Sequence, residues 1–127
     1  MCSAINCTKD DKESSMAEIS ILGKWYHKEV IVNNTVFPYD DHEICGKDFI
    51  EFYDINKIRS VDIWSCAEDV NWIGTFTKIN NILKIQNGSE QRIVEIETLN
   101  ESTLSYKCKY DSNNDGILEN HVETFNR

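Results

Sequence analysis

The stretch Leu22-Gly23-Lys24-Trp25-Tyr26 limits what this chain can fold into more than any other. A Gly two residues before a Trp, at the start of a strand-like segment, lets the backbone turn tightly because Gly has no side chain to clash. The indole can then cap one end of a closed sheet, and a guanidinium on its face would stabilise it by roughly 0.5 to 2 kcal/mol. The printed sequence ends in Thr124-Phe125-Asn126-Arg127, so Arg127 is the predicted partner of Trp25.

Gly23, Trp25 and Arg127 together form the signature that lipocalins carry. The chain therefore resembles a lipocalin-like protein of the calycin group and, more narrowly, the short lipocalin-like lipoproteins of the Bacteroidetes (flavobacterial) type. This resemblance implies an all-β fold, an eight-stranded antiparallel up-and-down barrel with a short N-terminal helix beneath it. It also implies a cup inside the barrel that holds a small molecule.

The residues themselves support an all-β fold, because strand-like segments are cut by turn residues and no stretch is long and periodic enough for a major helix. Asn87-Gly88 is the strongest hairpin signal. Short links and an even number of strands favour a barrel that closes without edges, whereas the alternative, a two-sheet sandwich, needs longer crossovers. The eight predicted strands are residues 24–32, 47–53, 58–66, 71–77, 82–86, 92–99, 103–110 and 117–125.

The chain divides into a predicted tether, residues 1–14, and one barrel domain, residues 15–127. The tether is polar and charged without periodicity, which is typical of segments that cannot bury enough surface to order. Ser15-Met16-Ala17-Glu18 matches a capping box, and apolar residues follow at helical spacing, so one or two helical turns are expected. A total of 13 basic and 22 acidic residues gives a net charge of −9, which disfavours nucleic acid as a partner.

Cys7, followed by Thr8 and Lys9-Asp10-Asp11, resembles the mature start of a bacterial lipoprotein. In the Bacteroidetes, an acidic tract behind a lysine and a lipidated Cys is associated with display on the outer surface. The resemblance thus implies lipidation of Cys7 and a place in the cell envelope, as an outer-membrane lipoprotein that is exposed at the surface. The alternative is that Cys2 and Cys7 are incidental thiols.

The cysteines after the tether are Cys45, Cys66 and Cys108, an odd number, so they form at most one bridge among themselves. Cys45 precedes the second predicted strand and Cys66 ends the third, so the two would face each other if these strands pair as a hairpin. A Cys45–Cys66 disulfide is therefore predicted, worth roughly 3 kcal/mol. Cys108, on an apolar face, is expected to be a buried free thiol that behaves as a small hydrophobic residue.

Candidate ligand-binding residues come from the alternation within strands and from the resemblance. Trp72 and Phe76 share one face of their strand, as do Tyr106 and Tyr110, and these four aromatics are the predicted wall of the cup. The long connection from Asn33 to Ile44 would fold over the mouth as the lid of a lipocalin. Its predicted lid residues are Phe37 and Tyr39.

A candidate metal site lies in the run from Asp111 to Gly116, where Asp111, Asn113 and Asp115 offer oxygens at alternate positions. Such a run resembles the opening of an EF-hand loop, but the twelfth position is Val122, so Ca²⁺ would have too few ligands. A polar hairpin is favoured, with a weak Ca²⁺ site as the alternative.

Sequence motifs of enzymes are lacking, and we expect no catalytic activity and no cofactor. The histidines are scattered, and pairing Trp25 with Arg127 would put His121 opposite Ile31. The function predicted is an envelope-tethered protein that binds a small apolar or amphipathic molecule; a non-catalytic barrel scaffold for protein contacts at the cell surface is the alternative. The expected partners are a small hydrophobic ligand and, through the lipid anchor only, the membrane, and the protein is expected to be a monomer.

Overall fold

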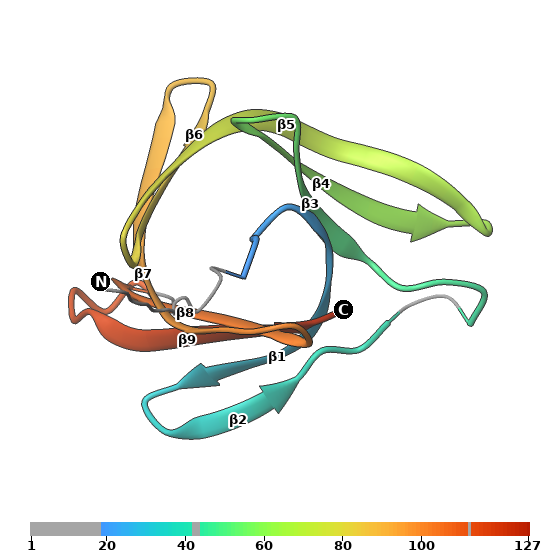
Figure 1. Ribbon diagram of the computed structural model, residues 1–127. Coiled ribbons are helices and arrows are strands. Elements are labelled where there is room, and N and C mark those ends of the chain that lie inside the picture. Colours follow the sequence, from blue (N-terminus) through green and yellow to red (C-terminus); the bar gives the residue numbers. More distant parts are fainter. Residues whose placement is uncertain (1–18, 42–43, 112) are drawn as a thin grey trace, which may run out of the picture.

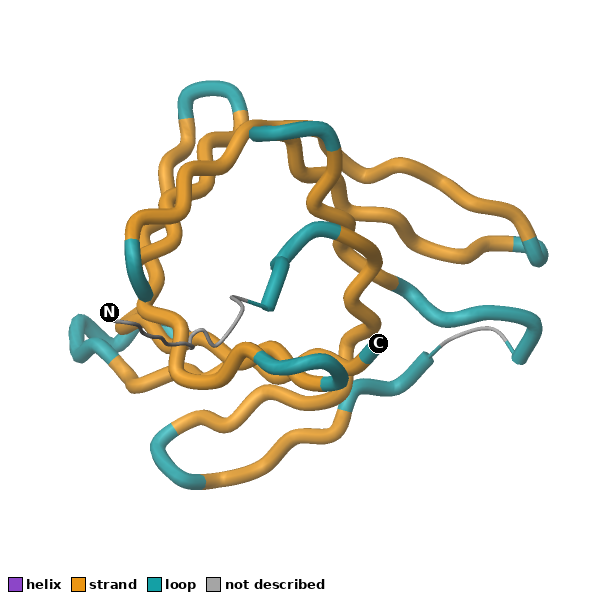
Figure 2. The backbone as a smooth tube through the Cα atoms, in the orientation of Figure 1, coloured by secondary structure: helices purple, strands orange, loops and turns teal. Residues whose placement is uncertain are grey.

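The computed structural model describes residues 19–41, 44–111 and 113–127, and there the chain forms strands and turns with no helix (Figures 1 and 2). No helix long and apolar enough to cross a bilayer is found in this described part. The strands are β1 Gly23–Val32, β2 Thr35–Pro38, β3 Phe49–Tyr53, β4 Lys57–Trp64, β5 Ala67–Ile79, β6 Ile82–Asn87, β7 Glu90–Leu99, β8 Thr103–Tyr110 and β9 Glu119–Asn126.

The sheet closes into a barrel because β1 pairs with β9 as well as with its neighbours β2 and β3. Every pairing is antiparallel, and β3 to β9 follow one another around the barrel in chain order. The wall therefore consists of eight strands, β1 and β3 to β9, which confirms the predicted up-and-down barrel. Figure 1 shows the ring of strands, with the β1–β2 and β4–β5 hairpins extending beyond it.

Strand β2 was not predicted. Residues 35–38 were expected to belong to a long loop from Asn33 to Ile44, and they form this strand instead. Asn33 and Asn34 have φ angles of 47° and 72°, the left-handed conformations of a two-residue hairpin turn. The chain then returns along β1, with Val32 opposite Thr35. Asn tolerates this backbone conformation better than most residues, so the Asn-Asn pair was the available signal.

The register between β1 and β9 also differs from the prediction, since His121 lies opposite Val32 and not Ile31. The cause is a β-bulge between His27 and Glu29, where Lys28 is the extra residue. An extra residue shifts the pairing by one position for the rest of the strand. As a result, Val30 lies opposite Glu123 on the inner face of the barrel.

The main hydrophobic core fills one end of the barrel, and we call this the closed end. Trp25, Phe52, Leu104 and Phe125 are each no more than 1% exposed there. Gly74 has no room for a side chain, because a Cβ atom would lie 2.2 Å from the backbone oxygen of Gln86 on β6. The strands β5 and β6 thus approach closely where the sheet curves around this core.

The predicted tether, residues 1–14, and the capping box at Ser15 to Glu18 lie outside the described residues. The segment from Ile19 to Leu22 is described and is not helical. Ile21 is 6% exposed and belongs to the core of the closed end. The chain therefore covers that end before β1 begins.

Candidate ligand-binding cavity

The closed end is held by the contact between Trp25 and Arg127. The guanidinium carbon of Arg127 lies 3.9 Å from the centre of the Trp25 ring, which confirms the predicted pair. Arg127 also donates from Nη1 to the carbonyl of Leu22 and from Nη2 to that of Ser20, each at 3.0 Å. Gly23 has a φ of 125°, which only Gly adopts readily, so the motif allows the backbone to bend around the guanidinium.

The side of the barrel next to β4 is fastened by the Cys45–Cys66 disulfide, as predicted. Close to it, the Asp48 carboxylate is 2% exposed and accepts hydrogen bonds from the Tyr39 hydroxyl at 2.5 Å and the Ile63 amide at 2.8 Å. Tyr39 and Asp48, at the two ends of the connection between β2 and β3, are therefore bound to each other and to the barrel wall.

A cavity of about 920 Å³ occupies the end of the barrel opposite Trp25 and Arg127, and we call it the cup. It lies where β6 ends, β7 begins and β8 ends, because its wall includes Asn87, Glu90 and Tyr110. Its volume is in the range of sites for small organic molecules. Apolar side chains line one part of it, from four different strands: Ile50, Ile58, Trp72 and Ile85.

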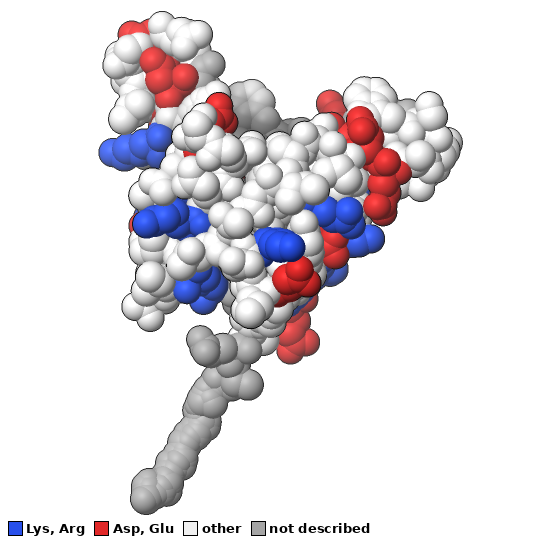
Figure 3. Space-filling view, turned by 90° about the horizontal axis from the view of Figure 1, so that it is seen from above, with Lys and Arg blue, Asp and Glu red and all other residues white. Residues whose placement is uncertain are grey.

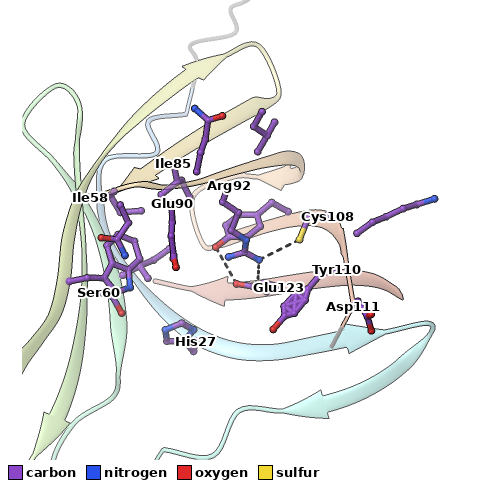
Figure 4. Close-up of a pocket in the computed structure, with 17 residues that line it drawn as sticks. His27, Ile58, Ser60, Ile85, Glu90, Arg92, Cys108, Tyr110, Asp111 and Glu123 are labelled. Atoms are coloured by element: carbon purple, nitrogen blue, oxygen red, sulfur yellow. Dashed lines mark hydrogen bonds and ion pairs between the residues drawn. The ribbon is translucent and has the colours of Figure 1, made fainter. Parts of the chain in front are cut away.

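A cluster of polar side chains lies in the wall of the cup (Figure 4). Arg92 on β7 and Glu123 on β9 form an ion pair in which Arg92 Nη2 donates to Glu123 Oε2. The Tyr106 hydroxyl donates to the other carboxylate oxygen, Oε1, at 3.2 Å. Arg92 Nη2 also lies 3.4 Å from Cys108 Sγ. We call these four residues the polar cluster.

The charges of the polar cluster stabilise one another. Burial lowers the pKa of Arg92, but the charge of Glu123 and the hydrogen bonds of the cluster together raise it by more, so the net shift is upward. Burial, with the charge of Glu123, also raises the pKa of Tyr106 well above its usual value. At neutral pH Arg92 is therefore charged and the phenol of Tyr106 is neutral.

His27 on β1 also lines the cup. Its ring stacks on that of Tyr39, with the two ring centroids 4.7 Å apart. The centroid of the Phe125 ring lies 5.0 Å from that of His27. Burial lowers the pKa of His27, against the attraction of nearby carboxylates led by Glu123. The imidazole is consequently uncharged at neutral pH.

The structure brings together three of the six predicted ligand-binding residues, since Trp72, Tyr106 and Tyr110 line the cup. Phe76 lies on the same strand as Trp72 but packs in the core of the closed end. Phe37 is 54% exposed on β2 and does not line the cup. Tyr39 stacks on His27 and is likewise not part of the lining, so the lid role of these two residues stays a prediction.

Sequence analysis missed the polar members of the lining, above all Arg92, Glu123 and Ser60. A signal was present: Arg92 shares the inner face of β7 with Val94 and Ile96, and Glu123 lies two residues before the buried Phe125. A charged residue in an otherwise apolar alternation often faces a functional interior.

The Asp111–Gly116 run forms the connection between β8 and β9. Asp111 accepts hydrogen bonds from the amides of Asp115 at 3.2 Å and Gly116 at 2.9 Å, and Asp115 accepts one from the Ile117 amide at 2.8 Å. One carboxylate oxygen each of Asp111, Asp115 and Glu119 lie within 4.8 Å of one another. The backbone bonds are those of a polar turn, and binding of Ca²⁺ at Asp111, Asn113 and Asp115 stays an untested alternative.

Comparison with known proteins supports the fold. No sequence-family model matches the chain, and no curated protein matches it in sequence. A lipocalin-like protein from Bacteroides uniformis is similar in structure with a TM-score of 0.61 and 13% identity, over 84% of this chain and 97% of that one. An uncharacterised protein from Bacteroides eggerthii gives a TM-score of 0.61 and 12% identity, over 85% and 99%. The chain thus has the fold of a lipocalin-like β-barrel.

Proposed function

We propose that the protein binds a small apolar or amphipathic molecule inside the barrel. The observation that carries this proposal is the cup itself, a cavity of about 920 Å³ in a barrel whose other end is tightly filled. A barrel that served only as a scaffold would gain stability from side chains that fill both ends, because apolar burial drives folding. The cup therefore favours ligand binding over the scaffold alternative.

The chemistry of the wall agrees with an amphipathic ligand. Ile50, Ile58 and Ile85 offer apolar contact, and Trp72 offers a large aromatic surface for stacking. The polar cluster can orient one end of a ligand by hydrogen bonds. On the face seen in Figure 3, acidic and basic side chains are interspersed over the middle, and no continuous basic patch is present.

The proposal is tested by titrating the protein with N-phenyl-1-naphthylamine, an uncharged aromatic probe whose fluorescence rises in apolar surroundings. We expect saturable binding, with a change in Trp fluorescence because Trp72 lines the cup. Ser60→Phe should weaken binding by about tenfold or more, since Ser60 lines the cup and a phenyl ring would take up its space. The matched control is Thr75→Phe, which adds the same ring at an exposed position on β5. Equal affinities for the two variants would contradict the proposal.

We also propose that the barrel is tethered to the cell envelope as an outer-membrane lipoprotein through Cys7. The support is the sequence alone, Cys7 with the Lys9-Asp10-Asp11 tract, since these residues lie outside the described part. Ser20 and Leu22 lie at the closed end, against Arg127, so the tether would join the barrel at that end. Metabolic labelling with a clickable fatty acid should mark the wild-type protein and not Cys7→Ser; label retained on the variant would contradict the tether.

A further inference from the structure

We infer that the ligand of the cup is an uncharged amphipathic molecule, with an apolar body and a hydroxyl or carbonyl oxygen that contacts the polar cluster. This inference rests on the proposed function and adds the charge and the polar group of the ligand. It makes a definite distinction between an uncharged ligand and one that ends in a carboxylate or an amine.

The first argument is that the charges of the polar cluster are already matched. Both oxygens of the Glu123 carboxylate accept a hydrogen bond, one from Arg92 and one from Tyr106. A ligand carboxylate placed beside Arg92 would therefore also lie beside Glu123 and be repelled. An amine placed beside Glu123 would meet Arg92. A charge of either sign loses hydration on entering the cup and finds no unmatched opposite charge in the cluster to replace it.

The second argument is that Arg92 keeps donors for a neutral oxygen. Both of its hydrogen bonds use Nη2, and its guanidinium carbon lies 5.6 Å from the centre of the Tyr106 ring. Within the described residues no hydrogen-bond partner is found for Nε and Nη1. Its side chain is 42% exposed while it lines the cup, so a ligand can reach these N–H groups. A hydroxyl or carbonyl oxygen can accept from them without bringing a charge next to Glu123.

The third argument concerns the other charged groups of the cup. Glu90, Asp111 and Lys109 also line it, so with Glu123 and Arg92 the cup holds three carboxylates and two cations, and His27 is neutral. The excess of one negative charge adds a further penalty for a ligand carboxylate. The apolar body of the ligand would lie against Trp72 and the isoleucines on the facing strands.

The experiment compares three ligands with the same eight-carbon chain, 1-octanol, octanoate and octylamine, as competitors of N-phenyl-1-naphthylamine at neutral pH. In the wild-type protein we expect 1-octanol to compete at concentrations at least about tenfold lower than either ion. Octanoate or octylamine competing as well as 1-octanol would overturn the inference and leave the proposed function standing. A probe that does not bind the wild-type protein at all would overturn both.

Because any apolar cavity prefers the uncharged alcohol, variants must show that the polar cluster sets the preference. Glu123→Gln leaves Arg92 unmatched, so the affinity for octanoate relative to 1-octanol should rise by about tenfold. Arg92→Gln leaves Glu123 unmatched and should raise the relative affinity for octylamine to a similar degree. If one variant does not fold, the other still tests the claim.

The matched control for the first variant is Glu90→Gln, the same chemical change at another residue of the cup wall. Removing either carboxylate changes the total charge of the cup equally, but only Glu123 is bonded to Arg92. A gain in octanoate affinity that is as large in Glu90→Gln as in Glu123→Gln would show that total charge alone decides, and would overturn the role of the cluster.

Discussion

The two ends of the barrel are built by the same strands but are filled in opposite ways. At the closed end, Trp25, Phe52 and Leu104 are almost fully buried, and Arg127 lies over the indole. In the cup, Tyr110 is 51% exposed and Arg92 keeps part of its surface open. The difference teaches that one end of the sheet supplies most of the apolar packing, which leaves the other free to hold polar groups and space.

The largest expected difference is between Trp25→Ala and Tyr110→Ala. Trp25 is fully buried, so its removal leaves a cavity and should lower the free energy of unfolding by about 3 to 5 kcal/mol. Tyr110 lines the cup, where space already exists, and Tyr110→Ala should cost less than about 1 kcal/mol. Urea unfolding followed by circular dichroism measures both, and similar losses would contradict the division between the two ends.

The next effect concerns the disulfide, which lies outside both ends. Replacing Cys45 and Cys66 together by Ser should lower the free energy of unfolding by roughly 3 kcal/mol, because a closed loop of this size restricts the unfolded chain. The affinity for N-phenyl-1-naphthylamine should stay within about threefold of wild type, since neither residue lines the cup. A much weaker affinity would mean that the segment between β2 and β3 shapes the cup.

A smaller effect is expected for Arg127→Met, which keeps the length of the side chain and removes the guanidinium. The stacking on Trp25 is lost, together with hydrogen bonds to the carbonyls of Ser20, Leu22 and Glu101. The expected loss is about 1 to 2 kcal/mol, seen as a lower melting temperature. Trp25→Ala with Arg127→Met should lose less than the sum of the two, because the residues are in contact. Strict additivity would argue against the stacking.

The smallest expected effect is the pH dependence that His27 gives to stability. Its pKa in the folded protein lies below the usual 6.5, because burial disfavours the charged ring. The unfolded chain therefore takes up a proton that the folded chain does not, and stability falls as the pH drops below about 6.5 toward the folded pKa. His27→Gln should lose less stability than wild type between about pH 7.5 and about pH 5.5 in urea unfolding. An equal loss would assign the effect to other groups.

The closed end could be predicted well because its signals can be read directly in the sequence. Gly23, Trp25 and Arg127 form a motif, and the positions of turn residues gave most strand limits to within a few residues. The cup could not be predicted to the same degree. Trp72 and Phe76 share one face of β5, and only the tilt and pairing of the strands decide that the first lines the cup and the second the core. Alternation gives the face of a residue but not its depth along the barrel.

Strand β2 and the bulge at Lys28 were missed for a different reason. Strand β2 lies outside the barrel wall and the bulge lies inside β1, so the pattern of residues that marks the wall strands reports neither. The Asn33-Asn34 pair could have shown the turn. The bulge has no comparable signal, since Lys28 is an ordinary residue in an otherwise continuous strand.

The bulge at Lys28 decides which acidic groups share the interior. In an unbroken ladder from Tyr26 onward, Glu29 would stand directly across from Glu123, and two negative side chains would compete for one guanidinium. With the additional residue, Glu29 turns outward beside Thr124 and a valine takes its place. The carbonyl of Lys28 accepts a hydrogen bond from the Tyr39 amide at 2.9 Å. A single inserted residue thus keeps a second carboxylate away from the Arg92–Glu123 pair and anchors the chain as it leaves β2.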